Sequence, residues 1–532
     1  PGPARAGGAD VGVRPPARAV PGRALDAPDV PDDENAPPSV AMKTTADVQS
    51  PGAMSTAAEV LPGLDRFEVR APLGSGGASV VYRAYDRERG AEVALKVLRR
   101  PSGRDLYRFK REFRALASLF HPNLVGLYEL FAFGDQWCIS MELIEGVGFI
   151  DWVRPARLSG ARPRAEIVAA PVELARLRAT LPQLVDGLAA LHAAGKLHRD
   201  LKPSNVLVTP EGRVVLLDFG LVAAAREREP DRLAVGTPAY MSPEQAADQP
   251  QSWPSDWYAV GAMLYEALTG RRPFEGAAEQ VMRRKQSERP APPTQLVAST
   301  PADLGNLCMA LLAAAPAQRP EVERIYSHLG TQPSPATREA RRLFAPTPLV
   351  GRQAELDVLR RALADCRRHG VTVFVRAPSG MGKTALLRRF VEEVADRALL
   401  LDGRCHERED VPFHTLDPIV DALAGALTGL PDDEASVVLP REVAPLTRLF
   451  PVLRRVPLLA ERSGGPTPPD PQELRQRAFT ALRQVLARLA KQRSVVVLID
   501  DLHWGDLDST AFLADLVPVS YTHLTLPTKR IV

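Results

Sequence analysis

The stretch HRDLKPSN occupies residues 198–205, and the triplet DFG follows at residues 218–220. The two segments place a carboxylate, an amide and a second carboxylate in the order and spacing that phosphoryl transfer uses. Asp200 can accept the proton of an attacking hydroxyl, while Asn205 and Asp218 can hold the metal ions that bridge phosphate oxygens. A chance polar loop between apolar runs is the alternative. Eight consecutive motif positions and a correctly spaced DFG argue against it.

A glycine-rich segment, LGSGGASVVY, lies upstream at residues 73–82. Glycines in a strand–turn–strand let backbone N–H groups close over phosphates, because no Cβ holds the chain away. Ser79 stands at the third glycine position, a departure that is expected to loosen this grip. Taken alone, the segment also fits a plain hairpin. The candidate nucleotide-binding residues of this loop are Leu73, Gly74, Ser75, Gly76, Gly77, Ala78, Ser79, Val80 and Val81.

The segment VALK ends in Lys96, the candidate contact for the α- and β-phosphates. The pattern that follows predicts a helix, with Glu112 on it as the candidate partner of Lys96 and a surface glutamate as the alternative. The apolar stripe of this helix consists of Leu106, Phe109, Phe113 and Leu116.

These motifs together resemble the eukaryotic-like protein kinase family, over about residues 61–327. The resemblance implies an α+β bilobal fold that binds ATP and Mg²⁺ between its lobes and phosphorylates a protein substrate. Lys202, two residues past the candidate catalytic Asp200, is typical of the serine/threonine class. The segment SMELIEG looks like the hinge, with Met141 as the gatekeeper and Glu142 and Leu143 next to the adenine.

The same resemblance gives roles to residues of the second lobe. It implies that Thr237 helps to hold Asp200 and Lys202, and that Asp256 braces the catalytic loop. It also pairs the late Arg319 with Glu244, which lies in Ser-Pro-Glu where the family usually has Ala-Pro-Glu. The Pro/Arg/Ala-rich segment 153–175 looks like an insertion, interpreted as a neutral loop with a docking site as the alternative.

Lysine usage supports these assignments independently. Lysine and arginine together number 67, and only nine of them are lysines. Such a composition converts lysine to arginine wherever a positive charge alone suffices, yet Lys96, Lys202 and Lys383 all stand at motif positions. A planar guanidinium cannot replace a compact ammonium between phosphates, so we expect the function of these positions to require lysine.

The segment from Asp218 to Glu244 lacks the usual regulatory phosphorylation site. Apart from Thr237, no serine or threonine lies between Gly220 and Ser242. Acidic residues stand there instead, and we hypothesise that a fixed carboxylate pairs with Arg199 and partly orders the loop, with a solvated charge run as the alternative. These acidic residues are Glu227, Glu229 and Asp231.

A second unit begins after the polar, proline-containing linker expected at residues 328–347. VTVFVR is a continuous apolar run suited to a buried parallel strand, and it leads into APSGMGKT and an amphipathic helix. This is a P-loop pattern in which Gly380 and Gly382 free backbone N–H groups, Lys383 reaches the β- and γ-phosphates and Thr384 meets Mg²⁺. Ala377 stands where the motif has glycine.

A second buried strand, SVVVLIDD, ends in Asp500 and Asp501. Asp500 is the candidate carboxylate for Mg²⁺, and Asp501 can polarise an attacking water, with an ordinary core strand as the alternative. The VGR opening, the P-loop and DDLHWGD together resemble the AAA-type ATPase module of STAND signalling proteins, over about residues 348–517. That resemblance implies an α/β P-loop fold and allows oligomers to form through it. Bacterial proteins that join this module to an N-terminal serine/threonine kinase are a known architecture.

Both ends of the chain depart from this composition. Residues 1–60 carry ten prolines and no aromatic residue, so they are expected to be disordered or untranslated, with Met42 or Met54 as the start. VSYTHLTLPT near the other end contains no Ala or Arg and resembles a translated sequencing-library adaptor. Residues 518–532 are therefore expected to be an artefactual tail. No strand is then expected after Asp500, which leaves the parallel sheet incomplete.

Composition limits the remaining classes. The net charge of +3 and the absence of a basic patch interleaved with aromatics give no sign of nucleic-acid binding. No apolar run is long enough to cross a bilayer, and no signal peptide is visible. The four cysteines lack disulfide or metal spacing, which suits a cytoplasmic location. They are Cys138, Cys308, Cys366 and Cys405.

The sequence thus predicts a bacterial serine/threonine protein kinase tethered to a regulatory P-loop NTPase. Two other functions stay open. A pseudokinase scaffold would only bind nucleotide, with the ATPase as its output. A nucleotide-gated switch would use the P-loop module to control partner binding, with the kinase as its readout.

Overall fold

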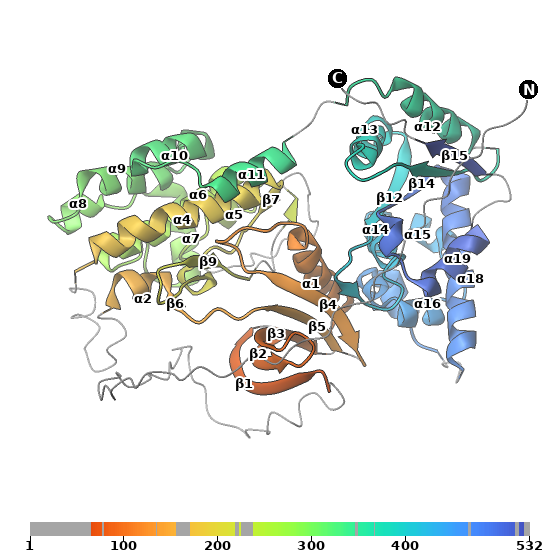
Figure 1. Ribbon diagram of the computed structural model, residues 1–532, viewed down its shortest axis with the longest axis horizontal. Coiled ribbons are helices and arrows are strands. Elements are labelled where there is room, and N and C mark those ends of the chain that lie inside the picture. Colours follow the sequence, from red (N-terminus) through yellow and green to blue (C-terminus); the bar gives the residue numbers. More distant parts are fainter. Residues whose placement is uncertain are drawn as a thin grey trace, which may run out of the picture. The chain divides into compact units, whose positions relative to one another are not determined.

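The computed structural model (Figure 1) describes residues 65–76, 79–99, 101–134, 136–155, 171–218, 223–224, 238–345, 349–366, 368–465, 470–516 and 521–525. The kinase-like part has a sheet-rich first lobe and a helical second lobe, and a mixed P-loop domain follows. The predicted fold class is confirmed in this arrangement.

The first lobe is built on a sheet with the strand order β1-β2-β3-β5-β4-β13. Its first five members pair antiparallel in that order: β1 (Phe67–Gly76), β2 (Ser79–Asp86), β3 (Ala91–Arg99), β5 (Gln136–Glu142) and β4 (Leu127–Phe133). Six successive residues of β3 are buried, as expected for a strand covered on both faces. The candidate nucleotide lysine therefore lies on the most protected strand of the lobe.

Helix α1 (Gly103–Leu116) packs beside this sheet. It begins with a capping box in which Ser102 and Asp105 exchange side-chain and backbone hydrogen bonds. The predicted apolar stripe is buried along its whole length: Leu106, Phe109, Phe113 and Leu116. The apolar residues that recur at helical spacing in the sequence are therefore the ones that face the core.

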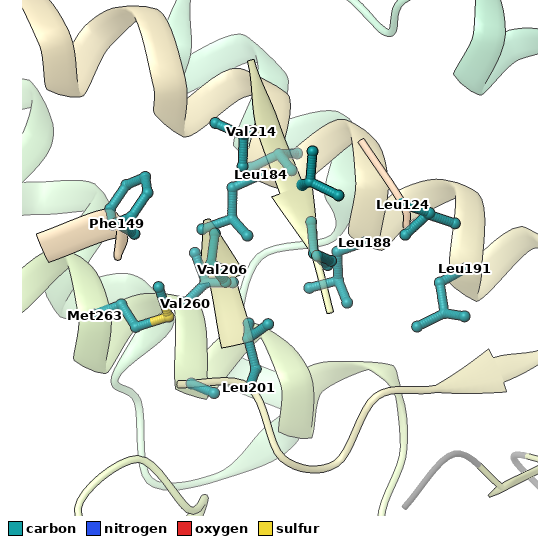
Figure 2. Packing of buried hydrophobic residues seen from close by; sticks show 14 of the residues in the cluster. Leu124, Phe149, Leu184, Leu188, Leu191, Leu201, Val206, Val214, Val260 and Met263 are labelled. Atoms are coloured by element: carbon teal, nitrogen blue, oxygen red, sulfur yellow. The ribbon is translucent and has the colours of Figure 1, made fainter. Parts of the chain in front are cut away.

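The second lobe surrounds the long helices α4 (Leu174–Ala193) and α6 (Trp253–Thr269). Figure 2 shows their apolar side chains packed with those of the small sheet β6-β8-β9, including Leu184, Val206 and Met263. The shorter elements here are β6 (Val147–Gly148), α2 (Phe149–Val153), β7 (Lys196–Leu197), η3 (Pro203–Asn205), β8 (Val206–Val208), β9 (Val214–Leu216), β10 (Ala223–Ala224), α5 (Pro243–Ala246), α7 (Ala278–Ser287), α8 (Pro293–Leu296), α9 (Ala302–Leu311), η4 (Pro316–Gln318) and α10 (Val322–Leu329). Strands β7 and β8 flank the loop that carries the candidate catalytic residues.

A buried ion pair fixes the end of the segment that closes at Glu244. Arg319 places Nη1 2.6 Å from Glu244 Oε1 and Nη2 2.7 Å from Oε2, and Ser255 donates to the same carboxylate. Burial alone would raise the pKa of Glu244, but the hydrogen bonds and charge of Arg319 outweigh it and the pKa is lowered. Helix α5 is thereby tied to the body of the second lobe.

The prolines and polar residues of 328–347 predict a linker, whereas the structure has a packed helix there. Helix α11 (Pro335–Phe344) starts at a Ser334 cap and buries Ala340 in the core of the second lobe. Thr337 Oγ1 lies 2.9 Å from Asp186 Oδ1 and 3.0 Å from His121 Nε2. A helix with polar residues can thus pack against the lobe when buried polar groups form hydrogen bonds with them.

The boundary of the predicted insertion at 153–175 also shifts. Arg154 is buried and donates to the carbonyl oxygens of Ala267 and Leu268 at the end of α6, at 2.7 and 3.0 Å. It therefore belongs to the core rather than to a loop. Residues 156–170 lie outside the described residues.

The second domain contains two parallel strand pairs. Strand β12 (Ala398–Arg404) pairs with β14 (Ser494–Asp500), and β11 (Thr372–Arg376) pairs with β15 (Tyr521–Thr525). The expectation that no strand follows Asp500 is therefore wrong. The alternating Tyr-Thr-His-Leu-Thr pattern of β15 suits a strand, and the open edge of β11 accepts it.

Helices complete this domain around two buried apolar clusters, the smaller of which is formed by α12 (Gln353–Asp365) and α13 (Lys383–Val394). The other helices are α14 (Asp417–Thr428), α15 (Asp432–Val438), α16 (Ala444–Leu449), η5 (Pro451–Arg455), α17 (Pro457–Glu461), α18 (Pro471–Gln492), η6 (Leu502–Trp504) and α19 (Leu507–Leu516). Among the described residues, no helix has both the length and the apolar character to cross a membrane.

The buried pair at Glu244 generates a stability prediction. Arg319→Met leaves the Glu244 carboxylate buried without its cation, so the free energy of unfolding should fall by about 3–5 kcal/mol. Urea unfolding followed by tryptophan fluorescence measures this. The matched control is Arg178→Met, which breaks an exposed pair with Asp303 and should cost about 1 kcal/mol or less. Equal losses in the two variants would contradict the role of the buried pair.

Candidate active site

Lys96 is the centre of the site between the lobes. Its Nζ lies 2.7 Å from Glu112 Oε1, 2.9 Å from Glu112 Oε2 and 2.8 Å from Asp218 Oδ1. Burial alone would lower the pKa of Lys96, but the two carboxylates outweigh burial and raise it. The glutamate of α1 and the aspartate of the DFG segment therefore meet at the charged ammonium of the β3 lysine.

The catalytic loop brings the other motif residues together. Lys202 Nζ lies 2.7 Å from Asp200 Oδ2, and Asn205 Nδ2 donates to the backbone oxygen of Asp200 at 2.9 Å. The short helix η3 turns the chain so that Asn205 faces back toward Asp200. Asp200 is thereby held by its own loop while its side chain stays partly exposed.

Asp256 braces this loop from beneath. Its carboxylate accepts hydrogen bonds from the backbone N–H groups of His198 and Arg199, both at 2.9 Å, and lies 2.8 Å from His192 Nε2. Burial alone would raise the pKa of Asp256, but the bonds from His192 and the backbone outweigh it and lower the pKa. The brace matters because Arg199 sits at φ 65°, a conformation that costs energy for a residue with a side chain.

The candidate metal ligands are Asn205 and Asp218. They offer an amide oxygen and a carboxylate, hard oxygen donors of the kind that Mg²⁺ prefers, so this donor set fits the ion. The Nδ2 atom of Asn205 is engaged with Asp200, which leaves its oxygen as the ligand atom. Lys96 lowers the pKa of Asp218, so the carboxylate is ionised and available to a cation.

The glycine-rich loop is the connection between β1 and β2. Gly74 pairs with Val81, Ser75 with Val80, and Gly76 with Ser79. A Cβ built on Gly74 would meet no atom within 4 Å, so this part of the hairpin is open. Leu73 at its base is exposed. Gly77 and Ala78 lie outside the described residues.

The hinge continues from β5. Met141 pairs with Ala94 and Glu142 with Val93, so the end of β5 lies beside the start of β3, the strand that carries the candidate nucleotide lysine. The Glu142 side chain turns away to Arg213, at 2.6 Å, and its backbone N–H donates to the Gly126 oxygen, which leaves the Glu142 carbonyl oxygen and Leu143 as the candidate contacts for an adenine ring. Four predicted residues of the activation segment lie outside the described residues: Thr237, Glu227, Glu229 and Asp231.

The P-loop residues also converge. Gly380 and Gly382 adopt φ values of 78° and 83°, which only glycine takes without strain, and the loop leads into α13 at Lys383. Thr384 Oγ1 lies 2.9 Å from Asp500 Oδ2, so the hydroxyl and the carboxylate expected to share Mg²⁺ are neighbours. The Lys383 ammonium donates to the Ala377 oxygen at 2.9 Å.

Asp501 has a partner that the sequence did not indicate. Arg404 Nη2, at the end of β12, lies 2.7 Å from Asp501 Oδ2. The carboxylate expected to polarise water is thus held by a cation from the neighbouring strand. The other residues that sequence reasoning missed are the brace partner His192 and two buried lysines, Lys110 and Lys285.

Lys285 could have been singled out in the sequence. It is buried on α7 and donates to the carbonyl oxygens of Ala239 and Met241, at 2.8 and 2.6 Å, near the end of the activation segment. Burial lowers its pKa to about 7. The rarity of lysine in this arginine-rich chain marks the residue, as it marked the three motif lysines.

Comparisons with known proteins agree with this geometry. Residues 67–329 match the protein kinase domain family, and residues 348–526 match the AAA ATPase domain family. The chain thus contains a member of the protein kinase domain family followed by a member of the AAA ATPase domain family. The ATPase match extends past residue 517 and includes β15.

The kinase part is similar to several bacterial serine/threonine-protein kinases. Pkn2 of Myxococcus xanthus is 38% identical over 229 residues, which cover 40% of this chain and 25% of that protein. PknL of Mycobacterium tuberculosis is 40% identical over 216 residues, 40% of this chain and 51% of that protein. PkaA of Streptomyces coelicolor is 36% identical over 280 residues, 49% of this chain and 48% of that protein. The chain thus spans a quarter to about half the length of these relatives.

The brace beneath the catalytic loop can be tested in the kinase. Asp256→Asn keeps the size of the side chain, but one amide oxygen cannot replace two carboxylate oxygens, so the loop should shift. A displacement of about 1 Å costs roughly 100-fold in rate. Phosphate transfer to a generic basic protein measures this, with Asp303→Asn on the exposed face of α9 as the control. Full activity of Asp256→Asn would show that the loop needs no brace.

Proposed function

We propose that the kinase domain transfers the γ-phosphoryl group of ATP to serine or threonine hydroxyls of a protein substrate. The observation that carries this proposal is the position of the Lys96 ammonium, 2.7 Å from a Glu112 oxygen and 2.8 Å from an Asp218 oxygen. An intact pair between the β3 lysine and the α1 glutamate, with the DFG aspartate beside it, is what phosphoryl transfer requires of a protein kinase.

Each residue then has a defined part in the transfer. Asp200 accepts the proton of the attacking hydroxyl and orients it, while Lys202 at 2.7 Å offsets charge beside it. Lys96 holds the α- and β-phosphates, and Glu112 keeps Lys96 in position. Bound between Asn205 and Asp218, Mg²⁺ would neutralise charge on the phosphate oxygens.

The chain's residues contribute positioning and electrostatics rather than covalent chemistry. Asp200 and Asn205 come from one loop, which Asp256 fixes through two backbone hydrogen bonds. Lys96 and Glu112 come from a strand and a helix of the first lobe. Because these groups are already in position, little reorganisation is needed during the reaction. Most of the rate enhancement of such sites arises from this preorganisation.

We further propose that the AAA module binds a nucleotide with Mg²⁺ and regulates the kinase, as part of cytoplasmic signalling. The Thr384–Asp500 contact and the open glycine conformations of the P-loop support nucleotide binding. The four cysteines are free thiols, which matches a reducing compartment. Assembly of several copies through the AAA module belongs to the same proposal.

The transfer itself is tested by Asp200→Asn, which removes the proton acceptor and keeps the shape of the side chain. The rate of transfer from radiolabelled ATP to a basic protein should fall by about 100- to 10,000-fold. Lys96→Met should abolish transfer as well, because the phosphates lose their ammonium. Undiminished autophosphorylation in either variant would refute the roles assigned to Asp200 and Lys96, whereas absence of transfer by the wild-type chain would support the scaffold function.

Regulation by the AAA module is tested by Lys383→Ala. Loss of the P-loop ammonium weakens nucleotide binding there and leaves the kinase residues intact. The kinase rate should fall by roughly 5- to 150-fold, the usual range for coupling between two sites. Lys491→Ala, on the exposed end of α18, is the control. Identical kinase rates for Lys383→Ala and wild type would remove the AAA module as the controller.

A further inference from the structure

Helix α1 carries a second set of charged contacts on the side away from the active site. The ammonium of Lys110 is fully buried and lies 2.8 Å from Asp417 Oδ2 and 2.7 Å from Asp421 Oδ1, both on α14 of the AAA module. Arg114, one helical turn later, contacts the same two carboxylates and Glu409. Two cations of the kinase helix thus meet three carboxylates of the other domain.

Backbone contacts join the two domains at the same place. Strand β13 (Glu409–Asp410) adds in parallel to β4, with Glu409 opposite Leu130, so the AAA module extends the sheet of the first lobe. Val411, just after β13, is buried in the kinase core. A Cβ on Gly103, at the start of α1, would lie 2.8 Å from the backbone N of Arg455 and 2.9 Å from the Pro451 oxygen. The fit is therefore too close for any side chain there.

The geometry of α1 connects this interface to the active site. Residues four apart lie on one face of a helix, so Lys110 and Arg114 point the same way. Glu112 stands between them in sequence and is rotated by about 200° from each, which directs it to the opposite face and to Lys96. The helix is thus held on one side by the AAA module and on the other by the catalytic lysine.

We propose that Asp417 and Asp421 of the AAA module are positioning residues for phosphoryl transfer: they hold Lys110 and Arg114, and through the rigid helix α1 they keep Glu112 on Lys96. The docked arrangement is the active one. This inference rests on the proposed kinase function and names the surface through which the AAA module acts.

The burial of Lys110 makes this contact specific. A fully desolvated ammonium is costly unless carboxylates surround it, and removing its partners leaves an unpaired buried charge. Helix α1 therefore cannot keep its position unchanged once Asp417 and Asp421 are gone. It moves until Lys110 reaches water, and Glu112 moves with it.

The interface is also tied to the nucleotide site of the AAA module. Arg404 binds Asp501, next to the candidate metal ligand Asp500, and Glu409 follows only five residues after Arg404. On the other side, Asp506 accepts a hydrogen bond from the Thr415 N–H at 2.9 Å, two residues before Asp417. Both segments that supply interface carboxylates are therefore anchored to the loop after β14.

The test uses two independent variants of the full chain. Asp417→Asn with Asp421→Asn removes the charges, and Gly103→Ala inserts a methyl group against the facing backbone. The value of kcat should fall by roughly 5- to 150-fold in each, with KM for the protein substrate unchanged. The controls are Asp432→Asn with Asp433→Asn, exposed on α15, and Gly425→Ala on α14, where a Cβ meets no atom within 4 Å.

A Glu112→Gln background separates positioning from general damage. If the interface acts through Glu112, the two Asp→Asn changes lower kcat in the wild-type background and add nothing in Glu112→Gln. An equal loss in both backgrounds overturns the inference, as does wild-type kcat in both interface variants. Binding of a fluorescent ATP analogue at the P-loop verifies that the AAA module stays folded. A wild-type chain with no transfer activity would instead refute the proposed function itself.

Discussion

The site depends on one buried ammonium held between two carboxylates that come from distant parts of the chain. Lys96 lies on a strand, Glu112 on a helix and Asp218 at the start of the activation segment. An ammonium in this position is stable only while both carboxylates stay within reach, because burial by itself disfavours the charged form. The position of α1 is therefore a condition for the site, and whatever holds α1 affects the chemistry.

Much of the site could be predicted because its residues belong to short, contiguous motifs. HRDLKPSN fixes a loop and a one-turn helix in eight residues, so Asp200, Lys202 and Asn205 are brought together locally. The partner of Lys96 was accessible for a similar reason, since Glu112 lies on the first helix after the strand. The P-loop could be predicted for the same reason, because its strand, glycine turn and helix are contiguous in the sequence.

The contacts that could not be predicted join residues hundreds of positions apart. Lys110 and Asp417 are separated by 307 residues, and nothing in either local segment indicates the other. The sequence of α14, DPIVDALAGALT, did hold a signal: two carboxylates four apart in an otherwise apolar helix call for buried cations. Strand β13 is only two residues long, too short for any pattern, and β15 was dismissed on composition although its alternation suits a strand. Docking of α11 depended on the buried Asp186, which sequence alone does not place.

Lysine usage connects the predicted residues with the missed ones. Lys110 and Lys285 are almost completely buried, and each binds two acceptors that lie close together. A compact ammonium fits between such acceptors, whereas a planar guanidinium needs a wider site. The same constraint that kept lysine at Lys96 and Lys383 thus operates at two structural positions. Rarity in a biased composition marks residues whose shape matters, whether they bind phosphate or hold domains together.

The activation segment gives a reason for control to lie at α1. Between Gly220 and Ser242 the only serine or threonine is Thr237, so the usual acceptor for an activating phosphate is missing. A kinase can be switched either by ordering this segment or by moving the helix that carries the glutamate. With the first route lacking its acceptor, the second has the stronger structural support. Lys110 and Arg114 are held on three carboxylates of the AAA module, while Glu112 of the same helix is held on Lys96. A nucleotide-dependent change in α14 or β13 would move all three residues of α1 together, because a helix of 14 residues shifts as one body.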